Sequence, residues 1–296
     1  MNALIFGVNG QDGYYLQELC KFKGVKPIGI SRSGDCIHAN VACYTQVEQL
    51  IKQYMPTYIF HLAANSTTRH DAIFENHETI STGTLNVLEA VKRHSPSTKV
   101  FITGSGVQFK NTGKPISELD EFEANSPYSI ARIQSVYAAR YYRSLGVRAY
   151  VGYLFHHESP LRKPNHVSKM IALAAQRIAA GSVEIIELGD VSVEKEWTFA
   201  GDVARGIFKL VTQEDVFEAT IGSGNACSIQ KWLECCFSFA GLDWRNHVKV
   251  KEGFTVEYPL LVSDPQTMNR IGWKALLDIN EVAAIMMDNK CVEDYP

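Results

Sequence analysis

A glycine-rich turn directly after a buried apolar run is the feature that most limits how this chain can fold. Residues 3–8 form a continuous apolar run, and Gly7, Gly10 and Gly13 follow in the segment GVNGQDG. Such a run is typical of a strand buried on both faces. Glycines there let the backbone turn tightly and approach a pyrophosphate at the N-terminus of the next helix. The segment predicts a dinucleotide-binding strand–turn–helix, although its spacing is G-x-x-G-x-x-G rather than G-x-G-x-x-G.

Apolar strand-like runs and helix-like segments alternate through the first half of the chain. We expect strands at residues 26–30, 57–63, 99–103 and 149–154, and a short one at 40–44. Helical spacing of apolar residues predicts helices at 46–54, 84–93 and 129–145. Repeated alternation of this kind indicates an α/β fold, a Rossmann-type doubly wound parallel sheet.

The alternation stops near residue 155. A loop is expected at residues 157–167, helices at 168–180, 229–240 and 280–289, and a strand at 184–188. We therefore divide the chain into a dinucleotide-binding domain, residues 1–155, and a smaller C-terminal substrate-binding lobe, residues 156–296. Some strands and helices of the second part are expected to return to the first domain.

Composition excludes several classes of protein. The 296 residues are 46% hydrophobic and 21% charged, which is ordinary for a globular protein, and the net charge of −3 does not fit a nucleic-acid partner. No apolar run reaches the ~20 residues that span a bilayer. The N-terminus runs straight into the first strand, so no signal peptide is expected. Seven cysteines without a C-x-x-C pair predict reduced thiols and a cytoplasmic protein, and no residue spacing predicts a metal site.

The second predicted strand ends in a basic residue between two hydroxyls. Ser31, Arg32 and Ser33 follow its apolar part. An acidic residue at this place would accept hydrogen bonds from the ribose of NAD, whereas an arginine suits a 2′-phosphate. The sequence therefore predicts NADP(H) as the cofactor.

A tyrosine and an arginine stand four residues apart at the start of a predicted helix. Tyr128 and Arg132 lie on one face of that helix. A nearby cation favours the ionised form of a phenol, which could then exchange a proton near neutral pH. Ser105, at the end of the preceding strand, could hold the reacting oxygen. These three residues are the candidate catalytic group.

The sequence resembles the extended short-chain dehydrogenase/reductases that act on nucleotide sugars, over nearly its whole length. It is most similar to the GDP-mannose 4,6-dehydratases and the related GDP-4-keto-6-deoxymannose reductases. The resemblance is carried by these segments: 7–16 (GVNGQDGYYL), 61–65 (HLAAN), 83–91 (GTLNVLEAV), 126–132 (SPYSIAR), 155–160 (FHHESP), 189–197 (GDVSVEKEW), 202–203 (DV) and 264–274 (DPQTMNRIGWK).

The resemblance implies roles for many residues. Tyr128 would be the acid/base, assisted by Arg132 and Ser105. The cofactor would contact Gly7, Gly10, Gln11, Asp12, Gly13, Ser31, Arg32, Ser33, Ala63, Ala64, Ser66, Tyr128, Arg132, Phe155 and His156. The sugar nucleotide would contact His156, Glu158, Ser159, Lys169, Lys195 and Trp197.

Three positions depart from the family pattern. Arg132 stands where the family has a lysine that also binds the nicotinamide ribose, and Phe254 where the dehydratases have an arginine at the diphosphate. Val107 stands where the dehydratases have a carboxylate, two residues after the catalytic hydroxyl, that removes the C5 proton. An apolar side chain cannot be a base. We therefore favour reduction of a GDP-linked 4-keto-6-deoxy sugar; the alternatives are 4,6-dehydration, epimerisation, or a cofactor-binding homologue that has lost catalysis.

The resemblance also implies a homodimer. Members of the family pack two helices from each subunit into a four-helix bundle. The corresponding segments here are residues 84–93 and 129–145, with Tyr137, Tyr141 and Leu145 as candidate contacts.

Overall fold

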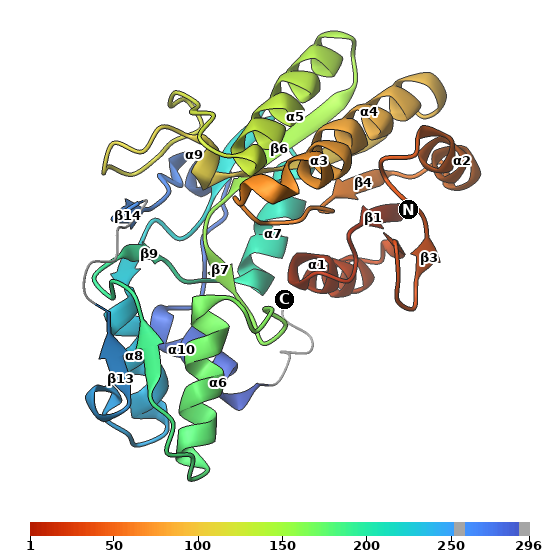
Figure 1. Cartoon of the computed structure of the whole chain (residues 1–296). Helices are drawn as coiled ribbons and strands as arrows, with labels where there is room; N and C mark the ends of the chain where they lie inside the picture. Colours follow the sequence, from red (N-terminus) through yellow and green to blue (C-terminus); the bar gives the residue numbers. More distant parts are fainter. Residues whose placement is uncertain (252–257, 290–296) are drawn as a thin grey trace.

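A seven-stranded parallel sheet forms the centre of the protein (Figure 1). The structure is a computed structural model that describes residues 1–251 and 258–289; Phe254 lies outside these ranges. The strands lie in the order β11-β6-β5-β4-β1-β2-β3. Their bounds are β1 (Asn2–Phe6), β2 (Lys26–Ser31), β3 (Ile37–His38), β4 (Tyr58–His61), β5 (Lys99–Ser105), β6 (Arg148–Leu154) and β11 (Glu218–Ile221). The predicted Rossmann-type sheet is confirmed.

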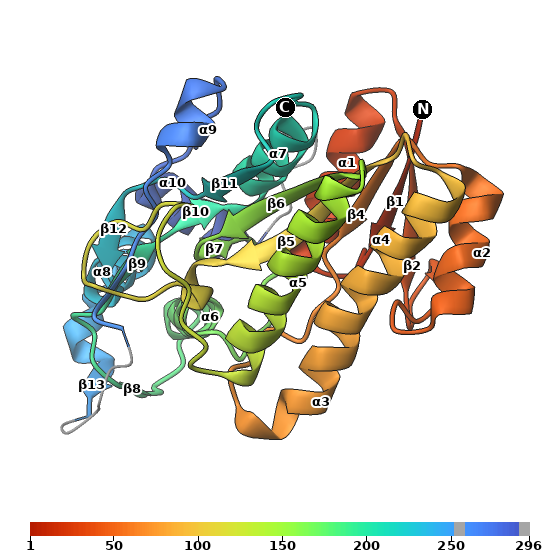
Figure 2. The same cartoon turned by 90° about the horizontal axis from the view of Figure 1, so that it is seen from above.

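Helices cover both faces of the sheet, because its strands carry apolar side chains on both faces. In β1, Ala3 and Ile5 belong to one core, and Leu4 and Phe6 belong to the other. The first core is covered by α1 (Gln11–Phe22) and α7 (Ala200–Val211). The second is covered by α2 (Tyr44–Tyr54), α4 (Gly83–His94) and α5 (Pro127–Ser144), as Figure 2 shows.

The chain leaves β1 toward β2 and β3 on one side, and continues toward β4, β5 and β6 on the other. The carboxyl ends of β1 and β4 are therefore the point where the winding reverses, and this point is where open α/β sheets bind ligands. Between β4 and α4 lies a helical stretch made of η1 (His70–Ala72), α3 (Ile73–Asn76) and η2 (His77–Thr82). A short helix, η3 (Gly106–Gln108), follows β5.

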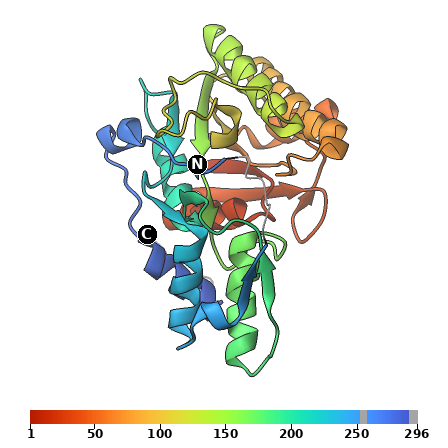
Figure 3. The ribbon, with the colours of Figure 1, turned by 60° about the vertical axis from the view of Figure 1, so that its left-hand side comes forward.

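Most of the chain after residue 155 forms a second, smaller lobe. Its helices are α6 (Val167–Ala179), α8 (Ile229–Phe239), η4 (Trp244–Asn246) and α10 (Ile279–Asp288); α6 and α8 pack side by side (Figure 3). The short helix α9 (Gln266–Arg270) packs instead against β11 of the large sheet. Its short strands are β7 (His157–Glu158), β8 (Ile186–Leu188), β9 (Glu194–Glu196), β10 (Thr198–Phe199), β12 (Ala226–Ser228), β13 (Val248–Val250) and β14 (Leu260–Leu261). The segments α7 and β11 lie with the large sheet, and the division at residue 155 stays a prediction.

The strand expected at residues 40–44 is wrong. The strand is β3, which ends at His38, and Tyr44 already begins α2. Asn40 explains the difference: its side-chain oxygen accepts from the backbone N–H of Ala42 at 3.1 Å, and its carbonyl oxygen accepts from that of Cys43 at 2.9 Å. These local hydrogen bonds stabilise a turn, whereas a strand would need hydrogen-bond partners on a neighbouring strand.

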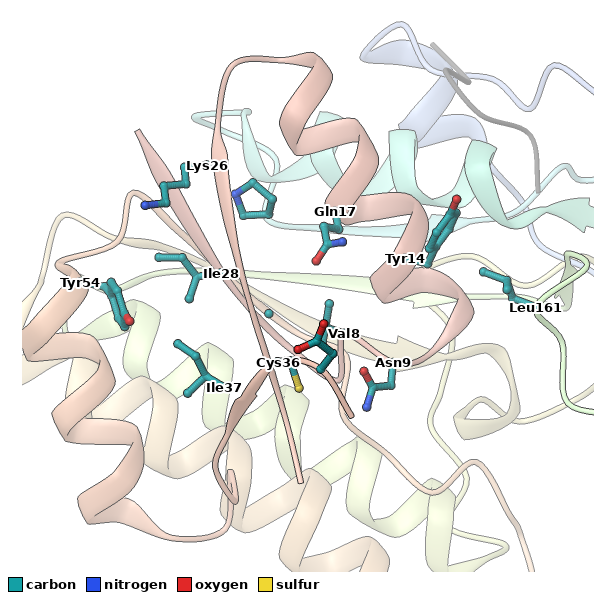
Figure 4. A pocket seen from close by; sticks show the side chains of 13 residues that line it. Val8, Asn9, Tyr14, Gln17, Lys26, Ile28, Cys36, Ile37, Tyr54 and Leu161 are labelled. Atoms are coloured by element: carbon teal, nitrogen blue, oxygen red, sulfur yellow. The ribbon is translucent and has the colours of Figure 1, made fainter. Parts of the chain in front are cut away.

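A short loop, residues 32–36, joins β2 to β3 without the helix that usually connects parallel strands. The sheet face beside α1 is consequently hollowed there, with a volume of about 650 Å³. Tyr14 and Gln17 of α1 border this hollow on one side, and Ile28 and Ile37 border it on the other (Figure 4). In the part of the chain that is described, no helix combines the length and the apolarity needed to cross a membrane.

Candidate active site

A cleft of about 570 Å³ lies at the carboxyl ends of the central strands. Its walls contain every predicted catalytic and cofactor-binding residue except Gly13. They are Gly7, Gly10, Gln11 and Asp12 after β1, Ser31, Arg32 and Ser33 at β2, Ala63, Ala64 and Ser66 after β4, Ser105 at β5, Tyr128 and Arg132 on α5, and Phe155 and His156 after β6. Residues far apart in sequence meet because the carboxyl ends of parallel strands share one edge of the sheet.

The glycine turn has close backbone contacts that exclude any side chain. Gly7 has a φ of +92°, and a Cβ there would lie 2.7 Å from the backbone nitrogen of Ala63. A Cβ at Gly13 would lie 2.6 Å from both the carbonyl oxygen of Gly7 and the Cα of Val8. Gly13 therefore lets α1 pack closely against the turn from behind, and it does not line the cleft. Gly10 precedes the first turn of α1 without a capping side chain.

Asp12 and His157 form a partly buried ion pair beside this turn. Nε2 of His157 lies 2.7 Å from Oδ1 of Asp12, and Nδ1 lies 2.6 Å from the carbonyl oxygen of Phe155. Both partners can only accept, so both ring nitrogens carry a proton and the imidazole is charged. Burial alone would lower the pKa of His157, but the charge and hydrogen bond of Asp12 raise it above its usual value. The same pairing lowers the pKa of Asp12 against the opposing effect of burial.

The preceding residue, His156, is neutral, in contrast to the charged His157. Nδ1 of His156 donates to the carbonyl oxygen of Glu196 at 2.9 Å, and Nε2 lies 3.0 Å from Oε1 of the fully buried Glu158. Burial, with the charges of Lys195 and Arg162, lowers the pKa of His156 well below its usual value, and burial raises that of Glu158. His156 is therefore neutral, and both of its ring nitrogens face protein groups, while Oε2 of Glu158 lies 3.7 Å from Nε of Arg162. In this arrangement His156 offers no base to a molecule in the cleft.

The other predicted substrate residues do not line the cleft and form a layer behind it. Trp197 stacks on Trp232 with ring centroids 4.6 Å apart and meets the His156 ring edge-on at 5.1 Å. Oγ of Ser159 donates to Oε1 of Gln11 at 3.0 Å. Nζ of Lys169 donates to Oδ1 of Asn289 at 2.5 Å. Lys195 also lies behind the cleft, and burial lowers the pKa of its ammonium group.

The candidate catalytic residues Ser105, Tyr128 and Arg132 share one wall. α5 begins directly before Tyr128, capped by Ser126, whose side chain accepts from the N–H of Ser129. The guanidinium of Arg132 lies 5.0 Å from the ring centroid of Tyr128, and its Nη1 donates to the carbonyl oxygen of Thr103 at 2.5 Å. Arg132 thus ties α5 to the end of β5 and holds a cation against the phenol ring.

The turn after β5 is held by a buried glutamine. Oε1 of Gln108 accepts from the backbone N–H of Ser105 at 2.8 Å, and Gln108 is fully buried. This contact fixes the backbone from which the Ser105 hydroxyl projects. Val107, between the two, lines the cleft. The position at which the resemblance expects a carboxylate therefore faces the cleft and is apolar.

The cleft also contains a basic group that the sequence did not predict. Arg162, Lys163 and His166 line the cleft from the loop between β7 and α6. Nη2 of Arg162 lies 3.2 Å from Nδ1 of His166, and burial, with the charge of Arg162, lowers the pKa of His166 to about 4. Arg162 and Lys163 follow the segment FHHESP, so the signal was a pair of basic residues in an expected loop. With Arg32 and Arg132 they give the cleft a cationic lining suited to an anionic ligand.

A protein-family model described as GDP-mannose 4,6 dehydratase matches residues 35–286. The chain belongs to this family. GDP-mannose 4,6 dehydratase 1 of Arabidopsis thaliana is 28% identical over an alignment that covers 97% of this chain and 88% of that relative. The GDP-mannose 4,6-dehydratase of Sinorhizobium fredii is 28% identical, over 81% of this chain and 76% of that protein.

Two solved structures share the fold of this family member over nearly its whole length. RMD from Pseudomonas aeruginosa, complexed with NADPH, superposes with a TM-score of 0.85 at 18% identity, covering 97% of this chain and 98% of that one. dTDP-glucose 4,6-dehydratase from Bacillus anthracis, in complex with NAD, gives 0.85 at 17% identity, covering 98% and 96%. By its family match, the chain is an enzyme of the extended short-chain dehydrogenase/reductase type that includes nucleotide-sugar dehydratases and epimerases.

Proposed function

We propose that this member of the family is an NADP(H)-dependent reductase of a GDP-linked 4-keto-6-deoxy sugar, acting as a cytoplasmic homodimer. The observation that carries the proposal is Val107, which faces the cleft where 4,6-dehydration needs a base. Reduction adds a hydride to C4 and a proton to the C4 oxygen. Dehydration instead takes a hydride from C4 and a proton from the C4 oxygen, eliminates water across C5 and C6, and returns the hydride to C6. Removal of the C5 proton in that sequence needs a second acid/base group.

The other titratable groups near the candidate catalytic wall are poorly suited to that second role. The nitrogens of His156 face Glu196 and Glu158, and Glu158 has no exposed surface. Asp12 is paired with His157. On the candidate catalytic wall, Tyr128 remains to exchange a proton with a sugar, and one acid is sufficient for reduction.

The cleft fits an NADP(H) molecule. A pyrophosphate would lie against the N–H groups of the glycine turn and the first turn of α1, where no side chain blocks its approach. Arg32 would hold the 2′-phosphate, as the sequence predicts. When bound, the reduced nicotinamide would supply the hydride.

The chain's own residues would direct the rest of the reaction. Tyr128 would donate its proton to the C4 oxygen as that oxygen becomes an alkoxide, and Ser105 would hydrogen-bond the same oxygen. Arg132, held against the phenol ring, would stabilise the tyrosinate that remains. General-acid assistance of this kind is typically worth ~10²–10⁴-fold in rate.

Turnover decides between the possible reactions. We expect NADPH to be consumed when a GDP-linked 4-keto-6-deoxy sugar is added, and Tyr128→Phe to lower that rate by ~10²–10⁴-fold while NADPH still binds. Conversion of GDP-mannose to its 4-keto-6-deoxy product would contradict the argument from Val107. Cofactor binding without turnover of either compound would point instead to a homologue that has lost catalysis.

A further inference from the structure

A carboxylate is already paired with Arg32, the residue predicted to bind the 2′-phosphate. Oε1 of Glu75 lies 3.2 Å from Nη2 of Arg32, and Oε2 accepts from Nδ2 of Asn65 at 2.8 Å. Glu75 comes from α3, 43 positions along the chain from Arg32. A carboxylate that the sequence did not connect with the cofactor thus stands at the end of β2, where the adenosine ribose of a dinucleotide binds.

The carboxylate of Glu75 is ionised and held in place. The hydrogen bond from Asn65 and that from Arg32 lower the pKa of Glu75, and the charge of Lys163 adds to the effect. The loop that carries Asn65 is itself fixed, because the buried Asn76 donates from Nδ2 to the carbonyl oxygen of Thr67 at 3.0 Å. Glu75 is therefore a negative charge at a defined place beside Arg32.

Two other charged residues of the segment that carries Glu75 have a partner of their own. Arg69 and Asp71 pair with each other at 2.7 Å. Lys163 lines the cleft and is the other cation that acts on Glu75. Glu75 thus does not itself line the cleft; it acts on the cofactor site through Arg32, which lines the cleft and lies 3.2 Å from its Oε1.

We infer that Glu75 sets the balance between NADP(H) and NAD(H) by competing with the 2′-phosphate for Arg32. This inference rests on the proposed nicotinamide cofactor. A phosphate monoester carries nearly two negative charges at neutral pH, so it must share Arg32 with the carboxylate, or displace it, and then remain close to that negative charge. A ribose without the phosphate meets no such repulsion, and its hydroxyls are donors that a carboxylate accepts. Arg32 favours NADP(H), Glu75 opposes it, and the wild type binds both cofactors with a small preference.

The inference is tested with Glu75→Gln, which removes the charge and keeps the shape of the side chain. Dissociation constants for NADPH and NADH are measured by fluorescence titration of the full chain. We expect Glu75→Gln to strengthen NADPH binding roughly three- to tenfold relative to NADH, a size usual for one partly exposed charge. The gain should shrink at high salt, because screening weakens a charge effect but leaves a packing effect unchanged.

Asp71→Asn is the matched control, since it removes one negative charge from the same segment but has Arg69 as its partner. It should leave the ratio of the two affinities within twofold of the wild type. A similar gain in Asp71→Asn and Glu75→Gln would overturn the inference, because general charge would then explain it. An unchanged or lower preference for NADPH in Glu75→Gln would overturn it as well.

Arg32→Ala separates this inference from the proposed cofactor. Loss of roughly tenfold or more in NADPH affinity, with NADH little changed, supports the assignment of Arg32. If Arg32→Ala behaves in this way but Glu75→Gln does not shift the ratio, only the role of Glu75 is wrong. If Arg32→Ala does not change the ratio, the proposed NADP(H) site fails, and the inference fails with it.

Discussion

Removal of the Asp12 carboxylate should destabilise the protein in a way that depends on pH. In Asp12→Asn the charged His157 loses its partner beside the glycine turn. Breaking a fully buried ion pair costs about 3–5 kcal/mol, but here the side chains of His157 and Asp12 are 10% and 23% exposed. Water can therefore solvate part of the charge, and we expect a loss of roughly 1.5–3 kcal/mol. For a chain of this size that lowers the melting temperature by about 2–5 °C.

The direction of the pH dependence follows from the two pKa shifts. The raised pKa of His157 means that its stabilising contribution is complete below the usual value of 6.5 and is lost as the pH rises through the folded-state pKa. The lowered pKa of Asp12 means that its contribution is present above 3.8 and is lost as the pH falls through its folded-state pKa. The difference between wild type and Asp12→Asn should therefore be largest between about pH 4 and 6.5 and smaller above this window.

Thermal unfolding followed by circular dichroism across this pH range measures the difference directly. Asp71→Asn is the control, because the pair that it breaks with Arg69 is 64% and 78% exposed, and such pairs contribute little. A difference that stays constant from acid to alkaline pH, or an Asp12→Asn variant as stable as the wild type, would refute the assignment of a charged His157.

Three further outcomes are expected. Gly13→Ala should lower the free energy of unfolding by about 1–3 kcal/mol in chemical denaturation, because its Cβ would meet backbone atoms at 2.6 Å. Gly10→Ala is the control: its Cβ would meet only an oxygen, at 3.5 Å, so its stability should stay close to that of the wild type. Arg132→Lys should keep or raise NADPH turnover if the arginine replaces the family lysine; complete loss would show that the bond to Thr103 is required. Light scattering should give about twice the chain mass of 33.0 kDa, and Tyr137→Arg, at a residue 59% exposed on α5, should reduce it toward the monomer.

The sequence predicted the central strands and the first-half helices well, because each is marked by apolar residues that the sheet buries. It missed α7, in which nearly every position is buried, including Ala200, Val203 and Ile207. Asp202, Arg205 and Lys209 nevertheless form a polar stripe at helical spacing along α7, so hydrophobic periodicity could have predicted this helix. The strand predicted near Asn40 is wrong for another reason. The hydrogen bond from the backbone N–H of Ala42 to the Asn40 side chain stabilises a turn there.

The cleft could be predicted as far as the ends of the strands, because topology alone brings those residues together. The surroundings of the predicted residues that do not line the cleft could not be predicted. Glu158 and Lys195 look in sequence like exposed charged residues near a motif, yet Glu158 is fully buried. The partner of Arg32 was equally hidden, because Glu75 reaches it from a segment whose fold depends on the burial of Asn76.

Two adjacent histidines show why a motif does not by itself assign chemistry. His156 and His157 share a sequence context and a buried setting, and burial alone would make both neutral. The carboxylate of Asp12 is partly exposed and stays ionised, so it keeps the proton on His157. His156 instead faces the charges of Lys195 and Arg162, which with burial hold its pKa well below its usual value, and Oε2 of Glu158 lies 3.7 Å from Nε of Arg162. The charges that face each ring, rather than the identity of the histidine, therefore decide which ring carries a charge beside the cleft.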